Sequence, residues 1–139
     1  MLELTLGIGV LGLVFAFLLA RFVLQEGTGT DAMRAISDAI KEGAEAFLRR
    51  QYRTIGILAV AVAILIYILY AFAKGDSEEA WRTTVAFLFG AFCSALAGYI
   101  GMYISIRANI RTANAVRTSM DRALKISFRG GAVSGVTIV

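Results

Sequence analysis

Three long runs without a charged residue constrain this chain more than any other feature. They cover residues 4–20, 55–73 and 83–106 and are 17, 19 and 24 residues long. A helix rises about 1.5 Å per residue and the apolar core of a bilayer is roughly 30 Å thick, so about 20 residues cross it. Because none of the runs alternates polar with apolar residues, each is predicted to span a membrane as a helix and not as a barrel strand.

The composition agrees with a membrane protein. Apolar residues make up 58% of the chain and charged residues 17%, whereas soluble domains contain about 45–50% and 25%. The chain has no His, no Pro and one Cys, which excludes a His base, a Cys/His metal site and a disulfide framework. The net charge is +4, and the Lys and Arg residues flank the apolar runs. Their positions indicate membrane topology and not nucleic-acid binding.

The positions of Lys and Arg predict one orientation. Residues 1–20 carry none, residues 21–53 carry six, residues 74–82 carry two beside three acids, and residues 107–129 carry six beside one acid. Positively charged segments stay in the cytoplasm. The N-terminus and the turn at 74–82 are therefore expected outside a prokaryotic cell membrane, and segments 21–53 and 107–129 inside.

The second helix is predicted to be longer than the membrane is thick. The segment Gly27-Thr28-Gly29-Thr30 ends the first helix, and Thr28 or Thr30 can cap the next. Apolar residues then recur at helical spacing, and no proline separates them from the run at 55–73. One continuous helix over 30–73 would measure about 66 Å, so about half of it is expected in the cytoplasm.

The third helix is predicted to extend in the same way. Beyond residue 106 an apolar stripe continues through Ile110, Ala113, Val116, Met120 and Ala123. The second and third helices are thus expected to form an antiparallel hairpin that rises from the cytoplasmic face, with its turn Lys74-Gly75-Asp76-Ser77 outside. In the alternative interpretation, the amphipathic parts lie flat on the lipid headgroups.

A fourth apolar run begins at Gly130 and continues to Val139. Ten residues cover only about 15 Å, half a bilayer. We therefore expect the amino-terminal part of a longer, all-α integral membrane domain. It has complete spans at about 2–24, 55–73 and 83–106 and a partial span at 130–139.

Several motifs fit helix packing better than chemistry. Residues 7–12 read G-x-G-x-x-G, but this pattern binds nucleotides only between a strand and a helix. Cys93 lies within a span and is expected to be inert. Small residues recur every four positions in two rows, which lets helices approach closely and predicts neighbours on both sides. The rows are Gly90, Ser94 and Gly98, and Ala97, Gly101 and Ser105.

The three uncharged runs at 4–20, 55–73 and 83–106 contain no carboxylate. Ion pumps usually need an ionisable group at membrane depth, and the chain has no acidic cluster of the kind that binds magnesium. We therefore predict no catalytic, cofactor-binding or metal-binding residue in these 139 residues.

Three regions resemble the second, third and fourth helices of membrane-bound, ion-translocating pyrophosphatases. The first region contains Gly29, Thr30, Met33, Ile36, Ala39, Ile40, Gly43, Ala44, Ala46, Phe47, Leu48, Arg50, Gln51 and Tyr52. The second contains Gly90, Ala91, Ser94, Ala97, Gly98, Tyr99, Ile100, Gly101, Met102, Arg107, Ala108, Asn109, Arg111 and Thr112. The third contains Phe128, Arg129, Gly130, Gly131, Ala132, Val133 and Gly135.

The resemblance implies a homodimeric pump of many helices that hydrolyses cytoplasmic pyrophosphate with magnesium and moves protons or sodium ions outward. The family's substrate motifs lie on later helices, so the resemblance implies a scaffold segment that is inactive alone. Its partners would be the lipid bilayer, the remaining helices of the pump and a second subunit. The alternative is a free-standing small membrane subunit, or a small transporter that works as an oligomer, without hydrolase activity.

Overall fold

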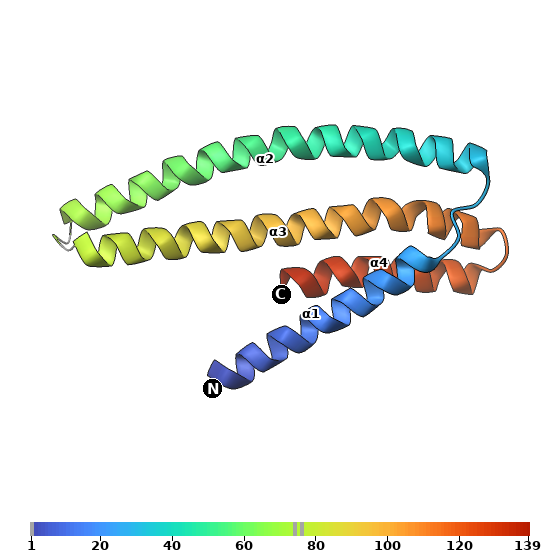
Figure 1. Ribbon diagram of the computed structural model, residues 1–139, viewed down its shortest axis with the longest axis horizontal. Coiled ribbons are helices and arrows are strands. Elements are labelled where there is room, and N and C mark those ends of the chain that lie inside the picture. Colours follow the sequence, from blue (N-terminus) through green and yellow to red (C-terminus); the bar gives the residue numbers. More distant parts are fainter. Residues whose placement is uncertain (1, 74, 76) are drawn as a thin grey trace. The chain divides into compact units, whose positions relative to one another are not determined.

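The computed structural model describes residues 2–73, 75 and 77–139. It contains four helices, α1 (Leu2–Gln25), α2 (Asp31–Ala73), α3 (Ser77–Val116) and α4 (Met120–Ile138), and no strand among the described residues (Figure 1). By length and composition α1, α2 and α3 are each able to cross a membrane. The predicted all-α membrane fold is therefore confirmed, and α2 is continuous, as expected.

The first loop ends α1 and starts α2 as the sequence predicted. Of the two candidate caps, Thr30 takes the role, because its hydroxyl accepts a hydrogen bond from the backbone N–H of Met33 at 3.4 Å. Asp31 lies in the first turn of α2, where a negative charge is favourable. Gly29 has a φ of 75°, a left-handed conformation that glycine adopts without strain.

The predicted extension of the third helix to Ala123 is wrong. Helix α3 ends at Val116, and Met120 and Ala123 belong to α4. The backbone N–H groups of Thr118 and Ser119 both donate to the Ala115 carbonyl, which closes the turn. The Ser119 hydroxyl then accepts from the Arg122 N–H and caps α4. Of the residues in the predicted stripe, Ile110 and Ala123 are buried, whereas Ala113, Val116 and Met120 are exposed.

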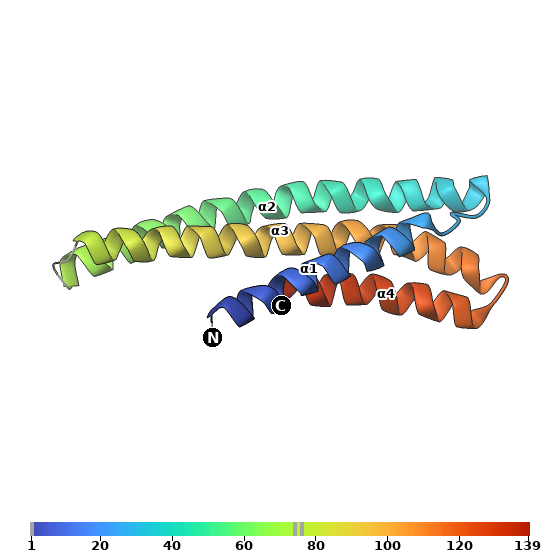
Figure 2. The same cartoon turned by 60° about the horizontal axis from the view of Figure 1, so that its bottom comes forward.

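The chain divides into two compact units. One unit, Ala46–Leu96, pairs the later part of α2 with the earlier part of α3 as an antiparallel hairpin, which Figures 1 and 2 show side by side. Its buried residues are Leu48, Ala63, Ala80 and Thr84, of which only Leu48 is large. The Tyr52 hydroxyl donates to the Ala95 carbonyl at 2.7 Å. Lys74 and Asp76 of the predicted turn lie outside the described residues.

The other unit comprises Met1–Glu45 and Ala97–Val139. Helix α4 runs antiparallel to both α1 and the end of α3 (Figure 2). It packs on both helices, since Val136 lies 3.6 Å from the position of a Cβ on Gly12 of α1, and Ser134 lies beside Gly101 of α3. Its core consists of Val23, Ala108, Ala115, Ala123 and Ile126. Burial of a large aliphatic side chain contributes about 1.5–3 kcal/mol to the free energy of folding. Val23 and Ile126 therefore stabilise the packing of α1, α3 and α4 against one another.

The two rows of small residues have different environments. Gly101 is buried, and a Cβ placed there would lie 3.0 Å from the Ser134 hydroxyl oxygen. Gly90, Ser94 and Gly98 are all exposed, and nothing lies within 4 Å of a Cβ on Gly90. Within the described residues the predicted close packing is confirmed for Gly101 alone.

Candidate functional site

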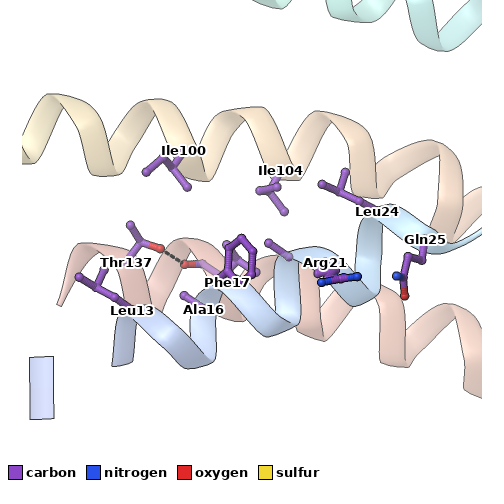
Figure 3. A pocket seen from close by; sticks show the side chains of 11 residues that line it. Leu13, Ala16, Phe17, Arg21, Leu24, Gln25, Ile100, Ile104 and Thr137 are labelled. Atoms are coloured by element: carbon purple, nitrogen blue, oxygen red, sulfur yellow. Dashed lines mark hydrogen bonds between the residues drawn. The ribbon is translucent and has the colours of Figure 1, made fainter. Parts of the chain in front are cut away.

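An apolar pocket of about 480 Å³ lies between α1, α3 and α4 (Figure 3). All of its lining residues belong to the unit built from Met1–Glu45 and Ala97–Val139. They are Leu13, Ala16, Phe17, Ala20, Arg21, Leu24 and Gln25 of α1, Ile100 and Ile104 of α3, and Val133 and Thr137 of α4. Its volume falls within the roughly 300–1,000 Å³ that ligand pockets span.

Three of these lining residues are polar, and they differ in whether their side chains have a hydrogen-bond partner. The Thr137 hydroxyl donates to the Val133 carbonyl of its own helix at 2.7 Å. Arg21 and Gln25 lie together toward the end of α1, away from Leu13 and Thr137 (Figure 3). The side chain of neither residue makes a hydrogen bond or an ion pair with any residue that the structure describes. The pocket is therefore apolar along its length, with unpaired donors at one end.

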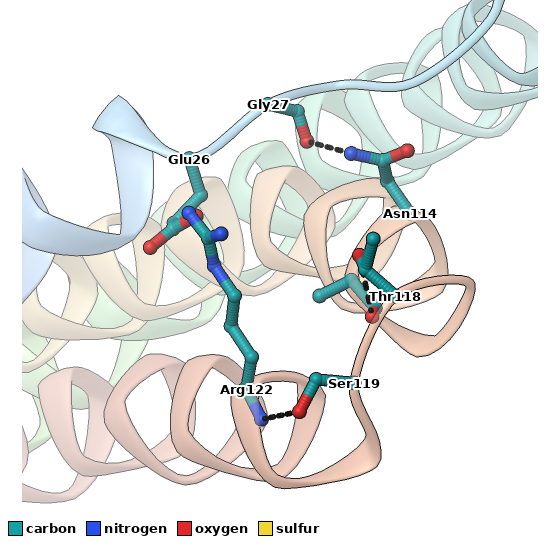
Figure 4. A network of polar contacts seen from close by, with 7 residues as sticks. Glu26, Gly27, Asn114, Thr118, Ser119 and Arg122 are labelled. Atoms are coloured by element: carbon teal, nitrogen blue, oxygen red, sulfur yellow. Dashed lines mark hydrogen bonds and ion pairs between the residues drawn. The ribbon is translucent and has the colours of Figure 1, made fainter.

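A polar junction joins the end of α1 to α3 and α4. The Arg111 side chain of α3 donates to the Leu24 carbonyl at 3.0 Å and to the Arg107 carbonyl at 2.7 Å. The Asn114 amide donates to the Gly27 carbonyl at 3.2 Å (Figure 4). The last carbonyls of a helix have no partner within it, so Arg111 satisfies a carbonyl near the end of α1 and Asn114 one just beyond it.

Arg111 is partly buried within this junction. Burial, with the neighbouring Arg107 guanidinium as the second cause, lowers the pKa of Arg111 from its ordinary value. Its Nε atom is buried and has no partner among the described residues. Because an arginine is effectively always charged, the junction holds a cation that two backbone carbonyls solvate.

Helix α4 reaches the same junction through an ion pair. The Arg122 guanidinium lies 2.7 Å from the Glu26 carboxylate, whose side chain is only 12% exposed (Figure 4). Nearby, the Arg129 guanidinium stacks 3.9 Å above the Phe22 ring, a cation–π contact worth about 0.5–1 kcal/mol at an exposed site. The two contacts hold the start of α4 against the end of α1.

The contacts of the junction join the ends of helices. Its ionisable members among the described residues are arginines and one paired carboxylate. Among the described residues no three His, Cys, Asp or Glu side chains come together. The prediction that this segment contains no site residue stays a prediction.

Sequence reasoning missed both the junction and the pocket. Arg111 stood in the resembling motif without a role, and neither Asn114 nor Arg122 was assigned a role. Their partners Leu24, Gly27 and Glu26 lie 87 to 96 residues earlier. One available signal was the loop glycine Gly29, where a Cβ would lie 2.9 Å from the Asn114 side-chain oxygen.

Comparison with known proteins identifies a family that matches most of this chain. The family described as inorganic H+ pyrophosphatase matches residues 10–139. A K(+)-insensitive pyrophosphate-energized proton pump 2 of Moorella thermoacetica is 48% identical over 130 residues, which is 94% of this chain and 18% of the relative.

Two further relatives give the same coverage. The K(+)-insensitive pyrophosphate-energized proton pump of Methanosarcina mazei is 45% identical, and pyrophosphate-energized membrane proton pump 3 of Arabidopsis thaliana is 39% identical. Each match covers 94% of this chain and 18% of the relative. The chain thus spans about a fifth of the length of these curated relatives. No solved structure matches it significantly.

Proposed function

The chain belongs to the inorganic H+ pyrophosphatase family, and from this premise we propose that it works within a membrane pump that couples pyrophosphate hydrolysis to outward proton transport. The observation that carries the proposal is identity of 39–48% to pyrophosphate-energized proton pumps over 94% of the chain. Such identity extends across all four helices, so it concerns the segment as a whole and not one motif.

Within that pump, these helices are proposed to act as a scaffold. The contacts of the polar junction join helix ends, and the uncharged runs supply no ionisable group at membrane depth. Pyrophosphate, magnesium ions and the transported proton would then be handled by other helices of the same protein. A homodimer is proposed from the family resemblance.

The proposed orientation places the polar junction in the cytoplasm. Arg111, Arg122 and Arg129 contact residues at or near the end of α1. Residues 21–53 and 107–129 each carry six basic residues. Positive-inside topology favours that side. The antiparallel course of α4 against α1 and α3 agrees with helices that cross the membrane in alternating directions.

The test is magnesium-dependent pyrophosphate hydrolysis in isolated membranes. The 139-residue chain is compared with the product of its uninterrupted reading frame, and membranes without either serve as the blank. We expect activity in the longer product and none above the blank in the short chain. Activity in neither would contradict the proposed function, and full activity in the short chain would contradict the scaffold role.

A further inference from the structure

The pocket between α1, α3 and α4 fits one class of ligand. We propose that it binds an anionic glycerophospholipid, with the phosphate at Arg21 and Gln25 and an acyl chain along the apolar lining. The inference goes beyond pump activity, because lipid binding here requires neither pyrophosphate nor hydrolysis.

The shape and lining of the pocket favour an acyl chain. From Leu13 to Gln25 the α1 wall extends about 18 Å, at 1.5 Å per residue. The α1 residues that line the pocket before Arg21 are all aliphatic or aromatic. Three further apolar residues, Ile100, Ile104 and Val133, line it from α3 and α4. A long apolar ligand such as an acyl chain matches the length and polarity of this wall.

The charge at one end selects the headgroup. Arg21 directly follows the uncharged run 4–20, which places its guanidinium at the membrane surface. Glu26, the acid that directly follows α1, is engaged by Arg122 at 2.7 Å, so no described carboxylate neutralises Arg21. Arg129 adds a second cation beside Phe22. Basic pockets between helices on the cytoplasmic side attract anionic headgroups.

The test uses the purified full-length protein, stripped of lipid in a neutral detergent. Phosphatidylglycerol and phosphatidylcholine with identical chains are titrated separately, and bound lipid is counted by native mass spectrometry. We expect selective retention of phosphatidylglycerol. Arg21→Gln should weaken that retention about fivefold, the factor that corresponds to about 1 kcal/mol per basic residue at the surface.

Matched variants separate the pocket from general surface charge. Arg49→Gln removes the same charge from an exposed position of α2 and should leave retention unchanged, whereas Arg21→Lys should keep most of it. Ala20→Phe, which fills the pocket, should abolish retention, and Leu18→Phe on the same helix outside the lining should not.

Three results would overturn the proposal. Equal retention of both lipids would remove the role of Arg21, and equal loss in the Arg21→Gln and Arg49→Gln variants would indicate nonspecific attraction. Displacement of phosphatidylglycerol by millimolar inorganic phosphate would show that the site takes the free anion and not a lipid.

Discussion

At the scale of single residues, glycines set how closely α3 and α4 approach. A Cβ on Gly130 would lie 2.9 Å from the Ala108 Cβ, and one on Gly101 would lie 3.0 Å from the Ser134 hydroxyl oxygen. Because lipid tails supply no hydrophobic drive between helices, close packing of this kind is a main source of their association. A larger side chain at either position must separate the helices.

Gly101→Leu is therefore expected to destabilise the protein. Overpacking of a tight contact costs about 1–3 kcal/mol, so the apparent melting temperature in detergent and the yield of folded protein should both fall. Gly90→Leu is the control on the same helix, since nothing lies within 4 Å of a Cβ there. An unchanged melting curve for Gly101→Leu would contradict the packing.

The sequence predicted Gly101 but could not rank the two rows of small residues. Spacing by four puts residues on one helix face, yet it carries no information about which face has a neighbour. The neighbour of Gly101 is Ser134, 33 positions away, and Gly130 was noted as the start of the fourth apolar run and within a resembling motif, without a packing role. Nothing in the spacing distinguished the exposed Gly90 from the buried Gly101.

At the scale of elements, helix ends were predictable where two local signals coincide. Gly27 and Gly29 interrupt the helix before the cap residue Thr30 and Asp31, and the structure has the break there. Thr118 and Ser119 carry no glycine or proline beside them, and the apolar stripe continues past them to Met120 and Ala123. The predicted helix therefore ran through the turn.

Ser119→Ala tests whether that cap holds the start of α4. Loss of an N-cap serine costs about 0.5–2 kcal/mol, so backbone amides of the first turn, residues 120–123, should exchange with deuterium faster. Ser105→Ala is the control, because Ser105 is exposed and its hydroxyl makes no hydrogen bond with any described residue. Equal exchange in both variants would show that the turn is fixed by Arg122 and Glu26 instead.

At the scale of the whole molecule, composition and charge predicted a helical membrane protein, but no tertiary site. The pocket needs walls from α1, α3 and α4, and its lining residues are separated by up to 124 positions, from Leu13 to Thr137. Hydrophobic periodicity indicates the apolar face of a single helix, but not which other helix packs against that face. Large apolar side chains such as Leu11 (69% exposed) and Phe72 (87% exposed) remain uncovered, as expected for surfaces that meet lipid or further helices.

The proposed orientation can be measured with single cysteines in the full-length protein. Cys93 is free and exposed, so it is first replaced by serine. Cysteines at Ser77 and Asp38, both exposed positions, then report the two sides of the membrane. Residues 74–82 carry more acids than bases and residues 21–53 carry six bases, so the positive-inside rule places Ser77 outside and Asp38 in the cytoplasm.

In intact cells an impermeant maleimide should label Ser77→Cys and spare Asp38→Cys, while both react after the membrane is permeabilised. The reverse pattern would place the polar junction outside the cell and remove it from the side where pyrophosphate is proposed to act.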